Sequence, residues 1–436
     1  MQLKVQAHFI SLAFNLSKHQ TNIIPMAQNK HNRNLDILRG VAALTVVLFH
    51  VISCYPTVFD KNFELGYFLN YNFPGHMGVL VFFILSGYVI AVNNPSLPDR
   101  KSISRYIRKR LIRIVPIYFV AMVFTFAITY GRYDLRQMLS NFFFVSVPFD
   151  NVTMENGPLW SLNYELLYYF AFIFFAYYNI SLVRTVKALI ATIAVLFIFF
   201  HNVHIYPLVI SYLIGFLFWC TGAMIATIGN WPRWKITSSR IIAILILIFC
   251  LQPFNPYGPI LKVLKIPMAD YSAYSWYQQS ITYSDLYYYP LTILLILSLT
   301  HAYAKRGVWL LYFLFISATI RLMMIFKVYG WAFVVKEHYL APAIILLLSI
   351  MLWALNFEVN TRVKKAILAT SSLGGISYGI YMIHLPLMFF FGMSGSCVGW
   401  LLALKFVGYF VMLFVMAYLL EHKFQPYVKK LLGRNK

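Results

Sequence analysis

Arg39 and His50 are ionisable residues in a segment, 35–50, that is otherwise almost entirely apolar. At about 100° per residue, an α-helix places both side chains on one face, about 16 Å apart along its axis. An ionisable side chain inside a bilayer costs about 2.5–3.5 kcal/mol on insertion scales, so each one is a candidate for function. His50 has the chemistry of a general base. The alternative is a histidine bonded to a neighbouring helix as part of the packing.

A second candidate is the basic segment 105–118, in which Arg110 and Arg113 are three residues apart. On a helix, this spacing puts both guanidinium groups on one face. Arginine forks bind phosphates well, so the pair predicts a site for an anionic donor such as a coenzyme A. Anchoring to lipid headgroups is an equally good explanation of the same residues.

A carboxylate, Glu165, follows in the segment 157–169. If a helix begins near Pro158, Glu165 lies about 9 Å inside it, and Ser161 shares its face. That depth is close to the depth of His50, so the two side chains could form an acid/base or base/orienter pair. The alternative is a Glu that bonds to Tyr or Arg for packing.

Two further segments carry polar residues inside apolar sequence. For Ser86 and Gly87, in 82–88, we favour close helix packing over direct contact with a substrate. In 377–386, Ser377, Tyr381 and His384 share a helical face, and His384 falls near the middle of the membrane, just before a proline. A direct chemical role for His384 is here the less favoured of two interpretations.

The elements that position these residues must be membrane helices, because 61% of the 436 residues are hydrophobic and only 11% are charged. A soluble domain carries about a quarter charged residues. Twelve apolar stretches are long enough to cross a bilayer, and we expect an all-α, polytopic bundle of about 10–12 helices. The stretches are 36–54, 77–93, 113–130, 159–178, 186–201, 207–228, 239–254, 287–303, 308–327, 339–356, 374–392 and 397–420. Two semi-apolar segments, 137–148 and 255–268, could be re-entrant.

The net charge of +23 is spread over short loops and forms no single basic face, so we expect no nucleic-acid partner. Lys and Arg concentrate on alternate loops, which places both termini in the cytoplasm. We therefore divide the chain into a cytoplasmic extension (1–33), a membrane-embedded domain (34–421) and a basic cytoplasmic tail (422–436). The four cysteines are scattered singly, and no metal site is expected. The loop 255–286, rich in Tyr, Ser and Gln, suits either a sugar-like partner or an interfacial aromatic belt.

The five polar segments, in this order, resemble the motifs of the acyltransferase family 3 membrane proteins, the bacterial integral-membrane O-acyltransferases. The likeness runs from about residue 34 to the C-terminal helix, and the middle, 180–370, matches only in hydropathy. The matching residues are Arg39 and His50; Phe82, Phe83, Ser86, Gly87 and Tyr88; Arg110, Arg113, Pro116 and Tyr118; Trp160, Ser161, Glu165, Tyr168 and Tyr169; and Ser377, Tyr378, Tyr381, His384 and Pro386.

The resemblance implies transfer of an acyl group, usually acetyl, from cytoplasmic acyl-CoA to a hydroxyl of a surface polysaccharide or lipid-linked sugar. It implies a multi-pass protein of the bacterial inner membrane, in contact with lipid. His50 would be the catalytic base or a transient acyl carrier, and Glu165 would orient His50 or bind the acceptor. The donor would be held by Arg39, Arg110 and Arg113. The substrate site would include Ser86, Trp160, Tyr381 and His384.

Two other functions fit a bundle with buried polar residues. A transporter or flippase would use a buried His and Glu as a proton relay or to bind a lipid-linked sugar. A glycan polymerase or ligase would need arginines on the outer loops to bind a diphosphate. The clustering of arginines on the predicted inner side, and the absence of an obvious internal repeat, favour the acyltransferase.

Overall fold

The computed structural model describes residues 32–54, 73–200, 207–228, 236–266, 274–300, 307–336, 339–392 and 400–433. Their regular secondary structure is entirely helical. Nine helices or helix pairs of the described chain are long and apolar enough to cross a membrane. They include α2 (Arg33–Cys54), α4 (Gly75–Asn93), α5 (Arg100–Ile128), α7 (Trp160–Tyr177), α8 (Leu182–Phe200), α9 (Pro207–Thr227), α13 (Val308–Lys336), α16 (Ser371–Phe390) and α17 (Trp400–Leu419). The predicted all-α, polytopic bundle is confirmed.

The three other predicted spans correspond to shorter helices. They are α10 (Ser238–Ile246), α12 (Tyr289–Leu299) and α14 (Leu340–Leu355). Two short helices, α6 (Leu135–Phe142) and α11 (Tyr257–Val263), lie where the sequence suggested re-entrant segments. Every predicted span therefore contains a helix, although their lengths differ.

Helix α5 begins thirteen residues before the predicted span, which started at residue 113. Asp99 caps the helix: the Ser102 backbone N–H donates to its carboxylate at 2.6 Å, and the Asp99 N–H donates to the Ser102 hydroxyl at 3.2 Å. This capping box satisfies two amides that the first turn leaves without partners. Residues 100–112, which precede the predicted span, are thus helical, and their basic side chains have defined directions.

The centre of the bundle is formed by α2, α4, α9 and α16. Helices α4 and α9 cross at two glycines: a methyl group at Gly87 would overlap the carbonyl of Trp219, and one at Gly222 would overlap the carbonyl of Ile84. Small residues let the backbones of membrane helices approach closely. The packing role predicted for Gly87 fits this crossing.

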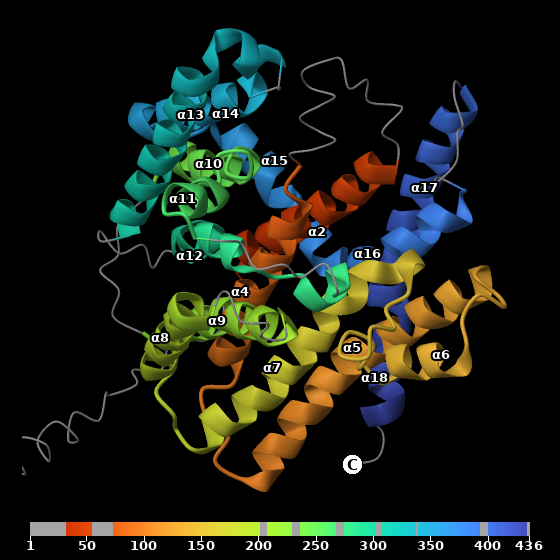
Figure 1. Cartoon of the computed structure of the whole chain (residues 1–436). Helices are drawn as coiled ribbons and strands as arrows, with labels where there is room; N and C mark the ends of the chain where they lie inside the picture. Colours follow the sequence, from red (N-terminus) through yellow and green to blue (C-terminus); the bar gives the residue numbers. More distant parts are fainter. Residues whose placement is uncertain are drawn as a thin grey trace, which may run out of the picture.

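The outer helices leave many large apolar side chains exposed, among them Phe313 and Ile316 on α13, Leu347 on α14, and Val407 and Val411 on α17. Such faces suit contact with lipid. Figure 1 shows α13 and α14 at one edge of the bundle and α17 at another.

The end of the chain turns back onto the bundle. A short π-helix, η6 (Leu420–Phe424), leads into α18 (Gln425–Gly433), which packs against α5 (Figure 1). The predicted tail, 422–436, is therefore helical over its described residues. The predicted extension lies almost wholly outside the described residues, which start at residue 32.

Candidate active site

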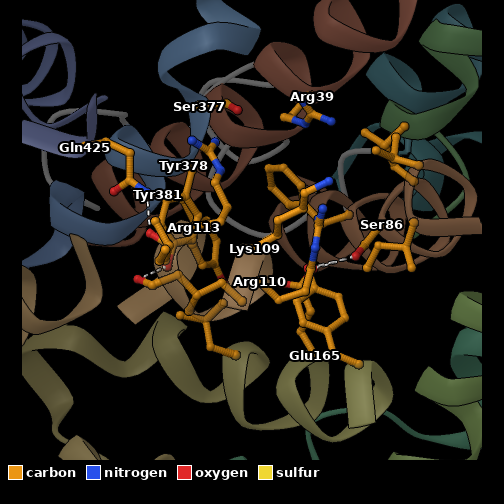
Figure 2. A pocket seen from close by; sticks show the side chains of 18 of the residues that line it. Arg39, Ser86, Lys109, Arg110, Arg113, Glu165, Ser377, Tyr378, Tyr381 and Gln425 are labelled. Carbon is orange, nitrogen blue, oxygen red and sulfur yellow. Dashed lines mark hydrogen bonds between the residues drawn. The ribbon is translucent and has the colours of Figure 1, made fainter. Parts of the chain in front are cut away.

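A cavity of about 1100 Å³ lies among α2, α4, α5, α7, α16 and α18 (Figure 2). Of its described lining residues, eight are basic and one, Glu165, is acidic. The basic residues are Arg39, Lys101, Arg105, Arg108, Lys109, Arg110, Arg113 and Lys429. A concave site with this excess of positive charge attracts an anionic ligand.

Six of the eight basic residues come from α5. Lys101, Arg105 and Lys109 are four residues apart, and Arg108 precedes Lys109; we call the part of the cavity that these four line the basic end. That spacing keeps them on one face of the helix. The basic end exists because the Asp99 cap extends α5 through this sequence.

Arg110 and Arg113 both line the cavity, but their partners differ. Arg113 forms a two-pronged ion pair with Glu421, in which Nη2 lies 3.1 Å from Oε1. Arg110 has its Nε buried without a hydrogen-bond partner among the described residues, and its guanidinium lies 5.9 Å from the ring centre of Tyr106. Arg110 therefore retains its full capacity to bind an anion, whereas the charge of Arg113 is balanced.

Glu165 forms a polar wall of the cavity together with Ser86 and Tyr169. The Ser86 hydroxyl donates to Glu165 Oε1 at 2.6 Å, the Tyr169 hydroxyl donates to the same oxygen, and the two hydroxyls are 3.2 Å apart. Figure 2 shows Ser86 and Glu165 joined in this way. Ser86 thus faces the cavity, while its neighbour Gly87 forms the helix crossing.

Tyr381 and Ser161 line the cavity beside this wall. Their hydroxyl oxygens are 2.8 Å apart, and the Tyr381 hydroxyl donates to the Pro158 carbonyl at 2.6 Å. The hydrogen bonds fix the Tyr381 ring, which forms part of the cavity surface.

His50 and His384 contact each other: His384 Nε2 lies 3.3 Å from His50 Nδ1. His50 Nδ1 is 2.8 Å from the Val46 carbonyl, and His384 Nδ1 is 2.8 Å from the Tyr381 carbonyl. A carbonyl can only accept, so in neutral rings both Nδ1 atoms carry the proton. The single His50 Nδ1–H is then shared between the Val46 carbonyl and the more distant His384 Nε2, and His50 Nε2 has no hydrogen-bond partner among the described residues.

This histidine pair does not line the cavity but lies one aromatic layer beyond it. Tyr381 forms that layer, since its ring faces the cavity and its centroid is 5.8 Å from that of His384. His50 is only half-buried, whereas His384 is fully buried. Among the described residues, Glu165 has no hydrogen bond to His50; the structure pairs His50 with His384 and Glu165 with Ser86 and Tyr169.

Trp160 is buried and also lies off the cavity. Its ring stacks on His76 at 6.3 Å and meets Trp276 edge-on at 5.9 Å. His76 is paired with Asp285, with Nε2 and Oδ1 3.1 Å apart. Sequence reasoning missed this contact between a histidine and a carboxylate, although a histidine at the start of an apolar span was a signal for it.

Sequence reasoning also missed the part that the chain end plays in the cavity. Gln425, Pro426 and Lys429 line it, and Glu421 holds Arg113. Glu421, an acidic residue directly after the last predicted span, was a usable signal. The arginines of the predicted donor site therefore share one cavity with Ser86 and Tyr381 of the predicted substrate site and with the predicted catalytic residue Glu165. The other predicted residues, His50, Trp160 and His384, do not line it. No cluster of three or more His, Cys, Asp or Glu that could hold a metal occurs in the described ranges.

The nine apolar helices of the described chain make this a multi-pass membrane protein. The family model for the acyltransferase domain Acyl_transf_3 matches residues 32–317, about two thirds of the chain. The chain belongs to this family, and the protein is an acyltransferase. No curated protein and no solved structure was found to match it.

Proposed function

We propose that this protein moves an acyl group, in the first instance acetyl, from acyl-CoA to a hydroxyl of a surface polysaccharide or lipid-linked sugar. It would work in the inner membrane of a bacterium, with both termini and the basic end of the cavity facing the cytoplasm. Whatever the acceptor is, the proposed reaction needs a donor that carries several phosphates at one end and a thioester at the other.

The observation that carries the proposal is the continuity of the basic end with the polar wall in one cavity. Eight basic residues and one acid line it. Coenzyme A has its phosphates at the nucleotide end and its thiol at the tip of a long pantetheine arm. Phosphates bound at the basic end would let that arm extend towards Glu165, Ser86 and Tyr381.

The direct mechanism requires the Tyr381 ring to move from between His50 and the cavity. His50 Nε2 then takes the proton of the acceptor hydroxyl as its oxygen attacks the thioester carbonyl carbon. The carbon–sulfur bond of the tetrahedral intermediate then breaks, and the thiolate receives the proton from His50. The products are the ester and free CoA thiol. In the two-step alternative, Nε2 itself attacks the thioester carbonyl carbon, the carbon–sulfur bond breaks, and CoA leaves as the thiolate. The acceptor hydroxyl then displaces the acyl group from Nε2, and its proton passes to the thiolate.

His384 would act on this reaction as a positioning residue. Its Nε2, by accepting from His50 Nδ1–H, favours the tautomer that leaves His50 Nε2 basic. Glu165 would act at the donor or acceptor through Ser86 and Tyr169, which it holds by hydrogen bonds. Arg39 and Arg110 would bind donor charge, and Trp160 would shape the acceptor side.

Thiol release from acetyl-CoA by the purified, detergent-solubilised protein, with crude surface glycan as acceptor, tests the proposal. We expect acceptor-dependent release by the wild type and none by a folded His50→Ala variant. Folded wild-type protein that releases no thiol with any short acyl-CoA or glycan fraction would contradict the proposal and favour transport of a lipid-linked sugar.

A further inference from the structure

Residues 420–433 are fastened along α5 in an antiparallel arrangement. Glu421 pairs with Arg113, the Gln425 side-chain amide donates to the Ile112 carbonyl, and Arg108 donates to the Leu432 carbonyl. Residue numbers increase along the chain end as they decrease along α5, so the two segments run in opposite directions. These three ties hold one face of α18 against the cavity.

The Gln425 side chain has a fixed orientation. Because the Ile112 carbonyl can only accept, the Gln425 nitrogen must face α5, and the oxygen must point the other way. Gln425 is 8% exposed and lines the cavity, and its Oε1 is buried without a partner among the described residues. A buried acceptor left without a donor costs about 1–3 kcal/mol, so this oxygen is suited to a ligand N–H.

Lys429 lines the same cavity one helical turn further along α18. Four residues of an α-helix advance about 6 Å. Lys429 lies between the level of Ile112, which is bonded to Gln425, and the level of Arg108, which is bonded to Leu432. It therefore adds its ammonium group to the basic end.

We infer that α18 forms part of the donor site, with Gln425 Oε1 accepting a pantetheine amide N–H of acyl-CoA and Lys429 binding its phosphates. The inference rests on the proposed function and extends it to a segment beyond residue 317, where the family match ends.

The order of groups in the donor supports this assignment. In acyl-CoA, the pantetheine amides lie between the thioester and the diphosphate. Along α5, Gln425 lies at the level of Ile112, and Lys429 lies between that level and the level of Arg108, which belongs to the basic end. One extended donor could therefore donate an amide N–H to the Gln425 oxygen and place its phosphates at Lys429.

The test measures CoA binding by calorimetry, and thiol release, on purified full-length protein. Lys429→Ala should weaken the Kd for CoA and raise the KM for acetyl-CoA about tenfold, because a charged contact to phosphate is lost. Its KM for acetyl-pantetheine, which lacks the nucleotide and its phosphates, should not change. The matched control is Lys430→Ala, which removes an exposed lysine of α18 that does not line the cavity.

Gln425→Leu should raise the KM for both donors about fivefold, because both retain the pantetheine amides. Thermal unfolding of each variant checks that α18 remains packed. If Lys429→Ala binds CoA as tightly as Lys430→Ala, while the wild type binds CoA and releases thiol, the inference is wrong and the proposed function stands. If the wild type neither binds CoA nor releases thiol, the proposed function itself fails, and the inference with it.

Discussion

His384 Nε2 lies 3.3 Å from His50 Nδ1, although the two histidines are 334 residues apart in the chain. Each ring also bonds through Nδ1 to a carbonyl of its own helix. The two helices, α2 and α16, therefore hold His50 in one tautomer, with Nε2 as the free basic atom. This arrangement makes the buried His384 a candidate positioning residue, a role that can be tested separately from that of His50.

Replacing His384 by Ala should lower kcat about 100-fold, because the general base loses the side chain that helps to hold its ring in one orientation, although the Val46 carbonyl still sets its tautomer. The KM for acetyl-CoA should change less than twofold, since His384 does not line the cavity. Single-turnover thiol release is the measurement. His384→Gln, whose side-chain oxygen can accept from His50 Nδ1–H, should recover part of kcat; an inactive Gln variant with normal folding would contradict the positioning role.

Arg110 and Arg113 should differ in what their loss does. Arg113→Ala leaves Glu421, only 2% exposed, as an unpaired buried carboxylate, at a cost of about 3–5 kcal/mol in stability. Arg110→Ala leaves no carboxylate without its partner, so stability should be nearly unchanged. The KM for acetyl-CoA should rise about tenfold. Thermal unfolding in detergent and donor titrations separate the two effects. Equal unfolding temperatures for both variants would count against the ion pair as the main role of Arg113.

Glu421→Ala should cost less stability than Arg113→Ala. The Arg113 side chain is 40% exposed, so water can solvate the guanidinium once the carboxylate is gone. We expect a loss of about 1 kcal/mol, measured by the same unfolding experiment. The reverse order of the two variants would show that the guanidinium is the more poorly solvated partner.

Ser86 and Glu165 should behave as one unit. Because Ser86 donates a hydrogen bond to Glu165 at 2.6 Å, Glu165→Gln should also reduce the contribution of Ser86 to the reaction rate. The double variant Ser86→Ala/Glu165→Gln should therefore be no slower than the slower single variant, with a coupling of about 1.5–3 kcal/mol in the activation free energy. Initial rates of the four proteins at saturating donor give this value. Fully additive losses would mean that the two residues act independently.

Gly87→Ala should destabilise the protein by about 3 kcal/mol, because the added methyl group meets the Trp219 backbone rather than a side chain that can rotate away. The matched control is Gly258→Ala, which meets nothing within 4 Å. Fluorescence-detected melting of the two variants is the comparison. A normal melting temperature for Gly87→Ala would show that α4 and α9 can separate at little cost.

The helices were predictable because apolar length alone decides where a chain can cross a bilayer, as in α2, α4 and α16. Spans such as α10 and α12 were predicted too long, since hydropathy does not register where a helix ends inside the bundle. The start of α5 was missed because its first residues are strongly charged, a pattern that is typical of a loop. The Asp99 capping box nevertheless starts the helix there.

Residue types in the site were predictable, but their partners were not. Arg39, Ser86, Arg110, Arg113, Glu165 and Tyr381 share one cavity. Depth along separate helices suggested that Glu165 would meet His50, yet depth does not specify which faces of α2, α4 and α7 are turned towards one another. The contacts of Glu421 and His384 depend on long-range packing, which a single sequence does not encode in its local pattern.

The ion pair between Arg113 and Glu421 joins residues 308 positions apart, and this separation has a consequence for biogenesis. At about 5–20 residues per second, a ribosome needs about 15–60 s to proceed from one to the other. Throughout that interval α5 lies in the membrane without Glu421, and the side of the cavity that α18 lines is open. An enzyme whose synthesis stops before residue 421 would lack both Glu421 and the residues of α18 that line the cavity.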